Sequence, residues 1–393
     1  MISITKISVF QDAHSRIVRC SVEADGLPAE LVFDGWSSRP LEFRPITFEW
    51  LPIALLYPAM AAGVSLKIDA SVSSLLLHNL NHDIQSLLCT FNPNLTKIKV
   101  IAQPLDVTPT ERPLVATGFS AGVDSFYTLA KFSAPDIPNS LRINCLTTFD
   151  VGAMGTANAS ANLFKKYSDR LINFSKERGL AAITLRTNLA EFYVSPTASF
   201  QMTHIIRNVS AAMFFNDIIG TYLYSSSYPY KDINKDNHDM SFIEPILLPL
   251  LSTETTRFVS AGAGLSRIEK MERVCNLPEA KEMLDVCVAS PEKRAHPEFR
   301  NCSRCWKCTR AMVTLDVLGK LDEFRAVFDV DMYRSDKPAF INRVVRRAVR
   351  GKPAEKDLVA LMKSKGFEGK LLAKAERKIK LYALRKRLAE LIS

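Results

Sequence analysis

The residues best placed for chemistry lie in a short turn, Gly118 to Ser125, between an apolar run and a helical pattern. The turn carries two hydroxyls, Ser120 and Ser125, and one carboxylate, Asp124. The first amides of a helix have no intrahelical partner and the helix dipole favours negative charge, so such a turn suits an anion. A carboxylate is wrong for a bare phosphate but right for a phosphate carried with Mg²⁺. The turn therefore indicates a nucleotide site, although no Gly-Lys-Ser/Thr follows as in a Walker loop.

The same residues allow two other interpretations. Gly118-Phe119-Ser120-Ala121-Gly122 also matches Gly-x-Ser-x-Gly, the nucleophile elbow of α/β-hydrolases, which likewise joins a strand to a helix. Ser120 would then need a later acid and a histidine, and the available histidines are His204, His238 and His296. The third interpretation is a glycine turn that opens a helix of the core. The nucleotide site is preferred because the elbow explains neither Asp124 and Ser125 nor the cysteines described next.

A second chemical group is the run Cys302-Ser303-Arg304-Cys305-Trp306-Lys307-Cys308. Three thiolates at two-residue gaps can converge on one tetrahedral ion, while a fourth ligand comes from elsewhere. Cys287 is the best fourth ligand, and the weaker candidates are His296 and Cys275. Four ligands close the site, which predicts structural zinc. An iron–sulfur cluster is the runner-up, and three unrelated reduced cysteines are the alternative without a metal.

The elements that position these residues follow a βα order from Pro113. The pattern predicts strands over residues 114–117, 141–150, 182–186, 221–225 and 258–261. It predicts helices over residues 124–132, 159–178 and 203–218. This alternation implies an α/β fold with a parallel sheet, helices on both faces and ligands at the carboxyl ends of the strands. One rim is then expected to carry Ser120, Asp124, Asp150 and the turns after Ser225 and Ser260.

The 393 residues are long enough for several domains. Residues 1–104 are predicted to form an N-terminal α+β domain without a chemical motif. Its patterns are alternating strands over 6–33, helices over 51–66 and 72–89, and a strand over 96–102. The other predicted domains are the βα domain, a four-cysteine zinc subdomain and a basic helical tail, over residues 113–285, 286–335 and 336–393.

The composition, with 47% hydrophobic and 23% charged residues, is that of an ordinary globular protein. The N-terminus lacks a signal-peptide layout, and the longest apolar stretch, Leu51 to Leu66, contains Pro58 and is too short to span a bilayer. A cytoplasmic protein without a membrane partner is therefore expected. Eight cysteines in a chain of this length do not indicate a disulfide scaffold, and the clustering of several of them indicates a metal site.

The net charge of +10 belongs to the tail. Residues 338–393 contain 16 Lys and Arg against 5 Asp and Glu, a net charge of +11, so the rest of the chain is about neutral. Apolar residues recur at helical spacing among the basic ones, which favours a packed helix with a solvated basic face. The alternative is a surface that binds a nucleic acid or an acidic protein partner.

The turn resembles the PP-loop of the ATP pyrophosphatases, Ser-Gly-Gly-x-Asp-Ser, with Ser120-Ala121-Gly122-Val123-Asp124-Ser125 in its place. Enzymes of this family split ATP between the α and β phosphates and adenylate a carbonyl or carboxylate oxygen. The resemblance implies a PP-loop domain, Rossmann-like and of the adenine nucleotide alpha hydrolase type. Ala121 departs from the pattern, and its methyl group is expected to be tolerated if φ is negative there.

The cysteines narrow the resemblance to the 7-cyano-7-deazaguanine synthase (QueC) family, which joins a PP-loop domain to a zinc site of one Cys followed by Cys-x2-Cys-x2-Cys. The zinc ligands implied in this way are Cys287, Cys302, Cys305 and Cys308. Three shorter elements occur in the family's order: Arg207-Asn208, Tyr228-Pro229 and Leu265-Ser266-Arg267-Ile268-Glu269. Arg267 replaces a lysine of the family, and Tyr230-Lys231 replaces Asp-Cys. The resemblance covers roughly residues 113–325.

The resemblance also implies roles for single residues. Those implied to bind ATP are Ser120, Ala121, Gly122, Val123, Asp124 and Ser125 in the loop, and Thr148, Phe149 and Asp150 near the adenosine. Asp124 would also hold Mg²⁺, and Arg267 would neutralise the α-phosphate as pyrophosphate leaves. Arg207 would hold a substrate carboxylate or phosphate, with a helix-surface arginine as the alternative. Asp150 has a strand-end turn residue as its alternative, and the polar stretch Lys231 to Ser241 is interpreted as a solvated loop in preference to a substrate lid.

By resemblance, the protein is an ATP-dependent carbon–nitrogen ligase that uses ATP, Mg²⁺ and Zn²⁺. It would adenylate a small-molecule carboxylate of the deazaguanine type and pass it to ammonia or an amine, releasing AMP and pyrophosphate. QueC-like proteins also occur in anti-phage defence operons, where a deazaguanine is linked to the N-terminus of a partner protein. The extra N-terminal domain and tail suggest such a diverged role. The alternatives are a serine hydrolase that uses Ser120 and a non-catalytic adapter that binds a partner through the basic tail.

Overall fold

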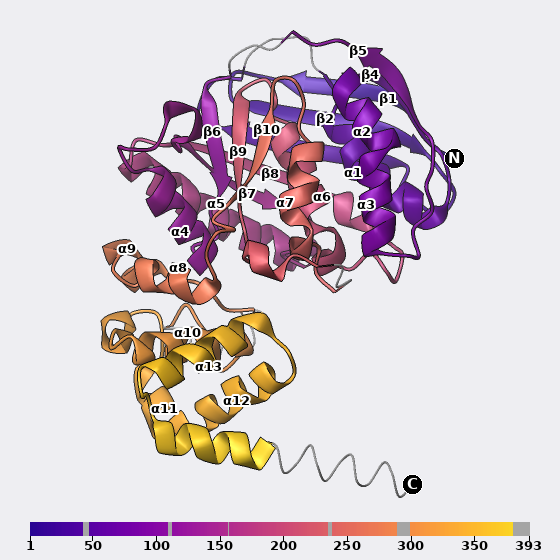
Figure 1. The fold of residues 1–393 in the computed structure, drawn as a ribbon. Coiled ribbons are helices and arrows are strands. Elements are labelled where there is room, and N and C mark those ends of the chain that lie inside the picture. Colours follow the sequence, from indigo (N-terminus) through magenta and orange to yellow (C-terminus); the bar gives the residue numbers. More distant parts are fainter. Residues whose placement is uncertain (42–46, 109–111, 156, 235–237, 289–298, 380–393) are drawn as a thin grey trace, which may run out of the picture. The chain divides into compact units, whose positions relative to one another are not determined.

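The computed structural model describes residues 1–41, 47–108, 112–155, 157–234, 238–288 and 299–379. The chain divides into two compact units. The first comprises residues 1–120 and 131–263, and the second comprises residues 121–130 and 264–393. The chain therefore enters the second unit directly after Ser120, and the whole sheet lies in the first unit (Figure 1).

The first unit is built on one ten-stranded sheet, in the order β10-β9-β6-β7-β8-β3-β2-β1-β4-β5. The strands of its βα half are β6 (Leu114–Gly118), β7 (Cys145–Asp150), β8 (Ala181–Thr187), β9 (Ile219–Ser225) and β10 (Arg257–Ala261). All pairs among them are parallel, as predicted. Every residue of β7 is buried, which accounts for its apolar sequence. The strand predicted over 141–150 begins only at Cys145, because Asn139–Leu141 forms a 3-10 turn.

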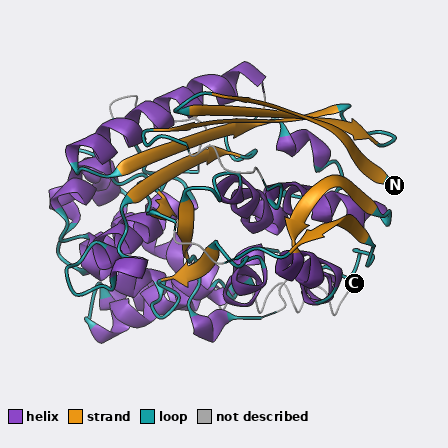
Figure 2. Ribbon diagram, turned by 90° about the horizontal axis from the view of Figure 1, so that it is seen from above, coloured by secondary structure: helices purple, strands orange, loops and turns teal. Residues whose placement is uncertain are grey.

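Helices lie on both faces of the sheet (Figure 2). α5 (Ala157–Glu177) packs on β7 and β8. α6 (Phe200–Met213) leads from β8 back to β9, so a right-handed crossover places it on the opposite face. α7 (Glu244–Leu250) packs on β10. The carboxyl ends of β6, β7, β9 and β10 share one edge, where ligands of parallel sheets bind.

The N-terminal residues extend the same sheet. Their elements are β1 (Ile2–Gln11), β2 (Ser15–Glu23), β3 (Glu30–Ser37), α1 (Trp50–Ala62), β4 (Leu66–Ser73), α2 (Ser74–Asn81), α3 (Asp83–Phe91) and β5 (Val100–Leu105). β3 pairs antiparallel with β8, and the buried Arg16 of β2 forms a 2.6 Å ion pair with Asp217, beyond α6. The sheet thus runs through both regions that the sequence predicts as separate domains. The helix predicted over 51–66 ends early, because Gly63 takes a left-handed φ of 65° that terminates α1.

The described residues of the second unit form helices joined by loops. Its elements are most of α4 (Val123–Phe132), α8 (Arg267–Val274), α9 (Pro278–Met283), α10 (Trp306–Val317), α11 (Val330–Ser335), α12 (Lys337–Val349) and α13 (Pro353–Ser364). α12 and α13 pack on each other and on α10, so this part of the tail is a packed pair of helices. Residues 380–393, the end of the predicted tail, lie outside the described residues. None of the described helices is both long enough and apolar enough to cross a membrane.

Candidate functional site

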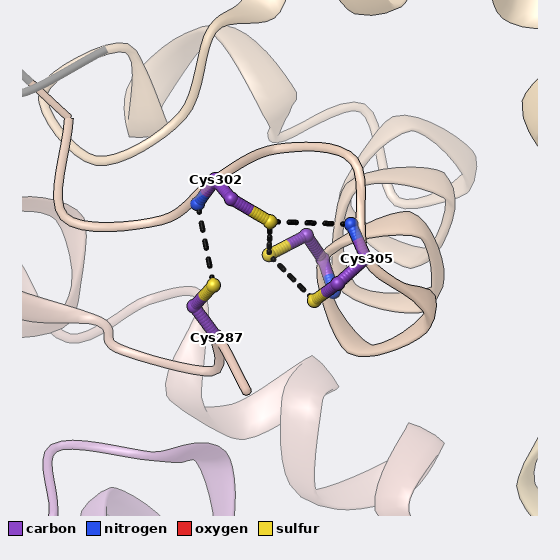
Figure 3. Close-up of side chains that lie close together, drawn as sticks. Cys287, Cys302 and Cys305 are labelled. Carbon is purple, nitrogen blue, oxygen red and sulfur yellow. Dashed lines mark hydrogen bonds between the residues drawn. The ribbon is translucent and has the colours of Figure 1, made fainter. Parts of the chain in front are cut away.

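Four cysteine sulfurs come together in the second unit. The Sγ atoms of Cys287, Cys302, Cys305 and Cys308 lie within 4.8 Å of one another. Cys308 Sγ lies 3.3 Å from Cys305 Sγ and 3.9 Å from Cys302 Sγ. Zinc–sulfur bonds of about 2.3 Å in a tetrahedron separate the sulfurs by about 3.8 Å, so the cluster has the dimensions of a closed zinc site. Figure 3 shows Cys287, Cys302 and Cys305 around the common space.

Backbone amides and a helix start surround these sulfurs. The amides of Cys302, Cys305 and Cys308 donate to the Sγ atoms of Cys287, Cys302 and Cys305, at 3.4, 3.2 and 3.5 Å. Cys305 is also the N-cap of α10, where the helix dipole favours a thiolate. Hydrogen bonds from Cys287 and Cys308 lower the pKa of the Cys305 thiol. Four thiolate donors in a closed arrangement are the ligands that structural zinc takes, so the site can bind zinc.

Of the two weaker ligand candidates, Cys275 does not join the described cluster. Cys275 is 2% exposed, and its thiol donates to the carbonyl of Glu272 at 3.3 Å. His296 lies outside the described residues. Among the described residues, the cysteine set is therefore the one that the spacing and the family resemblance indicated.

Asn301 holds the two cysteine-bearing segments together, although no sequence pattern pointed to it. Its side chain accepts a hydrogen bond from the amide of Val286 and donates to the carbonyls of Leu284 and Val327. The residue is 1% exposed, so these bonds form away from water. Ser303 has a φ of 56°, which lets the chain turn sharply between the second and third ligands. The metal centre thus depends on a buried amide as well as on its sulfurs.

The turn Gly118 to Ser125 joins β6 to α4, as the sequence predicts. Ala121 in this turn has a φ of 57° and a fully buried side chain. The condition of a negative φ is therefore not met: Ala121 adopts the left-handed conformation that glycine adopts without strain. In a nucleophile elbow the strained residue is the serine itself, whereas here the positive φ falls on Ala121 and not on Ser120.

Within the second unit, the turn is bonded to the segment that leads to the first metal ligand. The amide of Asp285, two residues before Cys287, donates to the carbonyl of Ala121 at 2.8 Å. The hydroxyl of Ser125 donates to the carbonyl of Gly122 at 3.1 Å, inside the first turn of α4. A change in the metal centre can therefore reach the turn through one backbone hydrogen bond.

Asp124 is paired with two cations of α8. Arg267 Nη2 donates to Asp124 Oδ2, and Lys270 Nζ lies 3.5 Å from Oδ1. A capping box begins this helix, because the side chains of Ser266 and Glu269 each accept from the other's amide. The box sets Arg267 at the first helical position and Lys270 one turn later. The structure thus brings the predicted Asp124 and Arg267 together and adds Lys270, whose side chain is only 1% exposed.

In the first unit, the residues predicted near the adenosine end β7. Thr148, Phe149 and Asp150 are all buried. Asp150 Oδ2 accepts from the hydroxyl of Ser160, on α5, at 2.6 Å, and Arg186 Nε of β8 lies 3.7 Å from the same oxygen. These contacts hold a strand-to-helix turn, which favours the turn-residue interpretation of Asp150. Its role toward adenosine stays a prediction.

Arg207 lies inside the first unit and not on a helix surface, so the helix-surface alternative is wrong: the residue is 4% exposed. Its Nη1 donates to the carbonyl of Val151 and its Nη2 to that of Ala198, at 3.3 and 3.1 Å, and its guanidinium carbon lies 3.9 Å from the ring centroid of Tyr193. Its Nε has no hydrogen-bond partner among the described residues. Burial lowers the pKa of Arg207. A buried guanidinium with an unused donor beside the end of β7 is suited to an anionic group.

α6 also carries His204, the centre of a polar cluster that the sequence did not reveal. His204 Nδ1 lies 2.8 Å from Tyr224 Oη, and Nε2 lies 3.3 Å from Asp239 Oδ1 and 3.2 Å from Ser241 Oγ. Both ring nitrogens therefore have partners other than Ser120, which does not support this histidine as the base of a hydrolase. The stretch interpreted as a solvated loop contributes Asp239 and the buried Ser241 to this cluster. These residues lie far apart in the sequence, so no sequence pattern predicts that they are in contact.

Comparisons of the chain with protein-family models, with curated proteins and with solved structures gave no match. The geometry is that of a mixed α/β protein with a mostly parallel sheet. It carries four close cysteines that can bind zinc.

Proposed function

We propose that the protein is a QueC-like, ATP-dependent carbon–nitrogen ligase. It adenylates a carboxylate of the deazaguanine type and passes the acyl group to ammonia or to an amine, such as the N-terminus of a partner protein in anti-phage defence. AMP and pyrophosphate are released. The observation that carries the proposal is the pairing of Asp124, in the first turn of α4, with Arg267 and Lys270. A carboxylate beside two cations at a helix start is suited to a metal-bound polyphosphate.

In this proposal Asp124, Arg267 and Lys270 handle the phosphates. Asp124 holds the Mg²⁺ that accompanies ATP, which shields the phosphate charge when bound. Arg267 and Lys270 then turn from Asp124 to the phosphate oxygens and neutralise the charge that develops as pyrophosphate leaves. Amides at the start of α4 donate to the phosphates. The hydrogen bond from Asp285 to Ala121 lets the zinc centre maintain the shape of the turn.

Arg207 is proposed to bind the carboxylate substrate. Arg207 presents an unused Nε donor beside the end of β7, where Thr148 to Asp150 are predicted to lie near the adenosine. Its guanidinium is fixed by two carbonyls and the Tyr193 ring, so the free donor is held in one direction. A fixed guanidinium binds a carboxylate or phosphate with little loss of side-chain entropy.

The test is pyrophosphate release from Mg-ATP in the presence of 7-carboxy-7-deazaguanine, the acid that corresponds to the nitrile in the family name. Wild-type protein should release pyrophosphate and AMP in equal amounts. Asp124→Ala should lower the rate by about 10²- to 10³-fold or more, because the phosphates lose the bridge between metal and protein. Asp136→Ala is the matched control, since Asp136 is an exposed aspartate that should leave the rate unchanged.

The reactivity of Ser120 tests the alternative that the protein is a serine hydrolase. A fluorophosphonate should not label it, because the ligase needs no serine nucleophile. Stoichiometric labelling of Ser120, with cleavage of simple esters and no requirement for ATP, would assign the turn to a hydrolase. A protein that consumes no ATP and labels with no fluorophosphonate would instead support the adapter interpretation, in which the basic tail binds an acidic protein or a nucleic acid.

A further inference from the structure

The proposed adenylation step gives no role to the hydrogen-bonded cluster around His204. Its side chains come from three separate elements: His204 from α6, Tyr224 from β9 and Asp239 from the turn before Met240–Phe242. His204 and Asp239 have side chains that are 14% and 27% exposed, and Tyr224 is half-buried. The cluster is therefore neither a closed part of the core nor a set of solvated surface groups.

The donor and the acceptor of each hydrogen bond made by His204 can be assigned. Burial acts to raise the pKa of Asp239, but the hydrogen bonds from His204 and from the amide of Ser241 help to lower the pKa below its usual value. An ionised carboxylate can only accept, so His204 Nε2 must donate to it. In a neutral imidazole the other nitrogen, Nδ1, then accepts from the hydroxyl of Tyr224, whose pKa is raised above its usual value by burial and the charge of Glu244. The result is a chain of donors that runs from Tyr224 through His204 to Asp239.

The position of Tyr224 places this chain at the ligand edge of the sheet. Tyr224 is the last residue but one of β9 and lies opposite Ser260 of β10. The preceding residue, Leu223, lies opposite Thr117 of β6, and β6 ends one residue later at Gly118. Arg207, which the proposed function assigns to the substrate, follows His204 by one turn of α6. Tyr224 is thus at the end of the first unit where an acyl group and its acceptor are expected.

We propose that Tyr224 and His204 remove the proton in the acyl-transfer step: Tyr224 relays it, His204 accepts it as the general base, and Asp239 holds His204; the proposal rests on the ligase function above. The amine nitrogen attacks the acyl carbon of the adenylate, so an N–C bond forms. The C–O bond to AMP breaks, and AMP leaves with the electron pair. The proton that the amine loses passes to Tyr224 Oη as the tyrosine's own proton passes to His204 Nδ1. The imidazolium formed in this way is held by the carboxylate of Asp239.

Two acceptors distinguish a base from a structural residue. Ammonium must lose a proton before it attacks, whereas hydroxylamine is unprotonated at neutral pH and nucleophilic enough to attack the adenylate with water as the proton acceptor. The experiment uses the full-length, zinc-loaded protein with Mg-ATP and 7-carboxy-7-deazaguanine. It measures three rates: acid-dependent exchange of pyrophosphate into ATP, hydroxamate formation and amide formation. The exchange reports adenylation alone.

Tyr224→Phe should lower amide formation by about 10²-fold or more, while exchange and hydroxamate formation stay within about threefold of wild type. Asp239→Asn should act in the same direction with a smaller loss, since the asparagine keeps an acceptor but not the charge. Tyr222→Phe is the matched control: it removes a buried hydroxyl of the same strand, bonded to Thr147, and should leave all three rates unchanged.

Two outcomes for Tyr224→Phe overturn the inference. If all three rates fall together, the residue serves adenylation or the fold and not the acceptor. If amide formation is unchanged, Tyr224 removes no proton. Failure of the ligase function is distinguishable from both, because the wild-type protein would then show no acid-dependent exchange at all, and the inference would fall with it.

Discussion

The four-cysteine centre and the turn Gly118 to Ser125 obtain their partners in different ways. Three of the four cysteine ligands lie within a run of seven residues, so chain spacing nearly assembles the centre by itself. The turn obtains Arg267 and Lys270 from α8, 143 and 146 residues after Asp124. The centre is thus a local feature and the charged cluster a tertiary one. Loss of one cysteine ligand should therefore abolish zinc binding, whereas a single substitution in the turn should change its stability only in part.

The largest effect is expected from Cys305→Ser. Cys305 is a predicted zinc ligand and the N-cap of α10, where its Sγ accepts from the Cys308 amide. A serine hydroxyl can keep this cap, so the change mainly removes the bond to the metal. Zinc binding to a site of this kind is folding free energy, about 10 kcal/mol or more in isolated zinc-finger peptides, so the loss here should be at least about 3 kcal/mol. Elemental analysis should find about one zinc per chain in the wild type and none in the variant, and the variant should unfold at a lower temperature.

Cys275→Ser is the control for this prediction. Cys275 is a buried cysteine of the same unit outside the described cluster, so the variant should keep its zinc. Wild-type protein without zinc, or a brown protein with an iron charge-transfer band, would contradict the zinc assignment. Equal zinc loss in both variants would mean that the unit responds to any buried cysteine change, and the centre would then not be a local feature.

A smaller effect is expected from Asn301→Ala, which tests whether spacing alone maintains the centre. The change leaves two carbonyls and one amide without their buried partner, at a cost of about 3 kcal/mol. Zinc should remain, bound more weakly, as competition with a chromogenic chelator would show. The exposed Asn276, which bonds only within its own helix turn, should tolerate the same change. Unchanged zinc affinity in Asn301→Ala would mean that the four cysteines assemble without the amide.

Glu355→Gln tests how far the metal centre's support extends into the tail. Glu355 is buried in α13 and accepts from Arg310 of α10 at 3.5 Å and from Arg347 of α12 at 2.9 Å. Loss of its charge should cost about 2 kcal/mol, less than for a fully buried pair because the Arg347 side chain is a quarter exposed. Urea unfolding should show this loss, while the exposed neighbour Lys356→Gln should show none.

The contacts of Glu355 predict different effects for two truncations of the tail. Removing residues 351–393 deletes α13 with Glu355 and should destabilise the second unit. Removing only residues 380–393 spares these contacts and should weaken just the salt-sensitive binding of a polyanion. A soluble, stable protein after the longer truncation would show that α13 adds nothing to the unit.

The sequence predicted the features that depend on short-range order. The βα periodicity gave the strands and helices around the turn, and the cysteine spacing indicated the metal ligands. It could not predict Lys270, because a lysine in an amphipathic helix is normally exposed and only tertiary packing buries it. It could not predict the contact of His204 with Tyr224 and Asp239, since these residues have no common periodicity. The pairing of β3 with β8 was missed for the same reason: it joins strands about 150 residues apart.

The smallest effect is expected from Ala121→Gly, which examines strain within the turn itself. A left-handed φ costs an alanine about 1 kcal/mol, and glycine removes that cost. Glycine also adds about 0.5–1 kcal/mol of unfolded-state entropy, so the net change should lie between zero and a slight stabilisation. Ala116→Gly is the matched control, because Ala116 is equally buried in β6 but has an ordinary strand backbone, and it should lose about 1 kcal/mol or more. The urea midpoints of the two zinc-loaded variants should therefore differ, with Ala121→Gly the higher. Equal destabilisation of the two variants would mean that losing the buried methyl of Ala121 costs as much free energy as relieving its backbone strain gains. The turn would then be packed as tightly as β6.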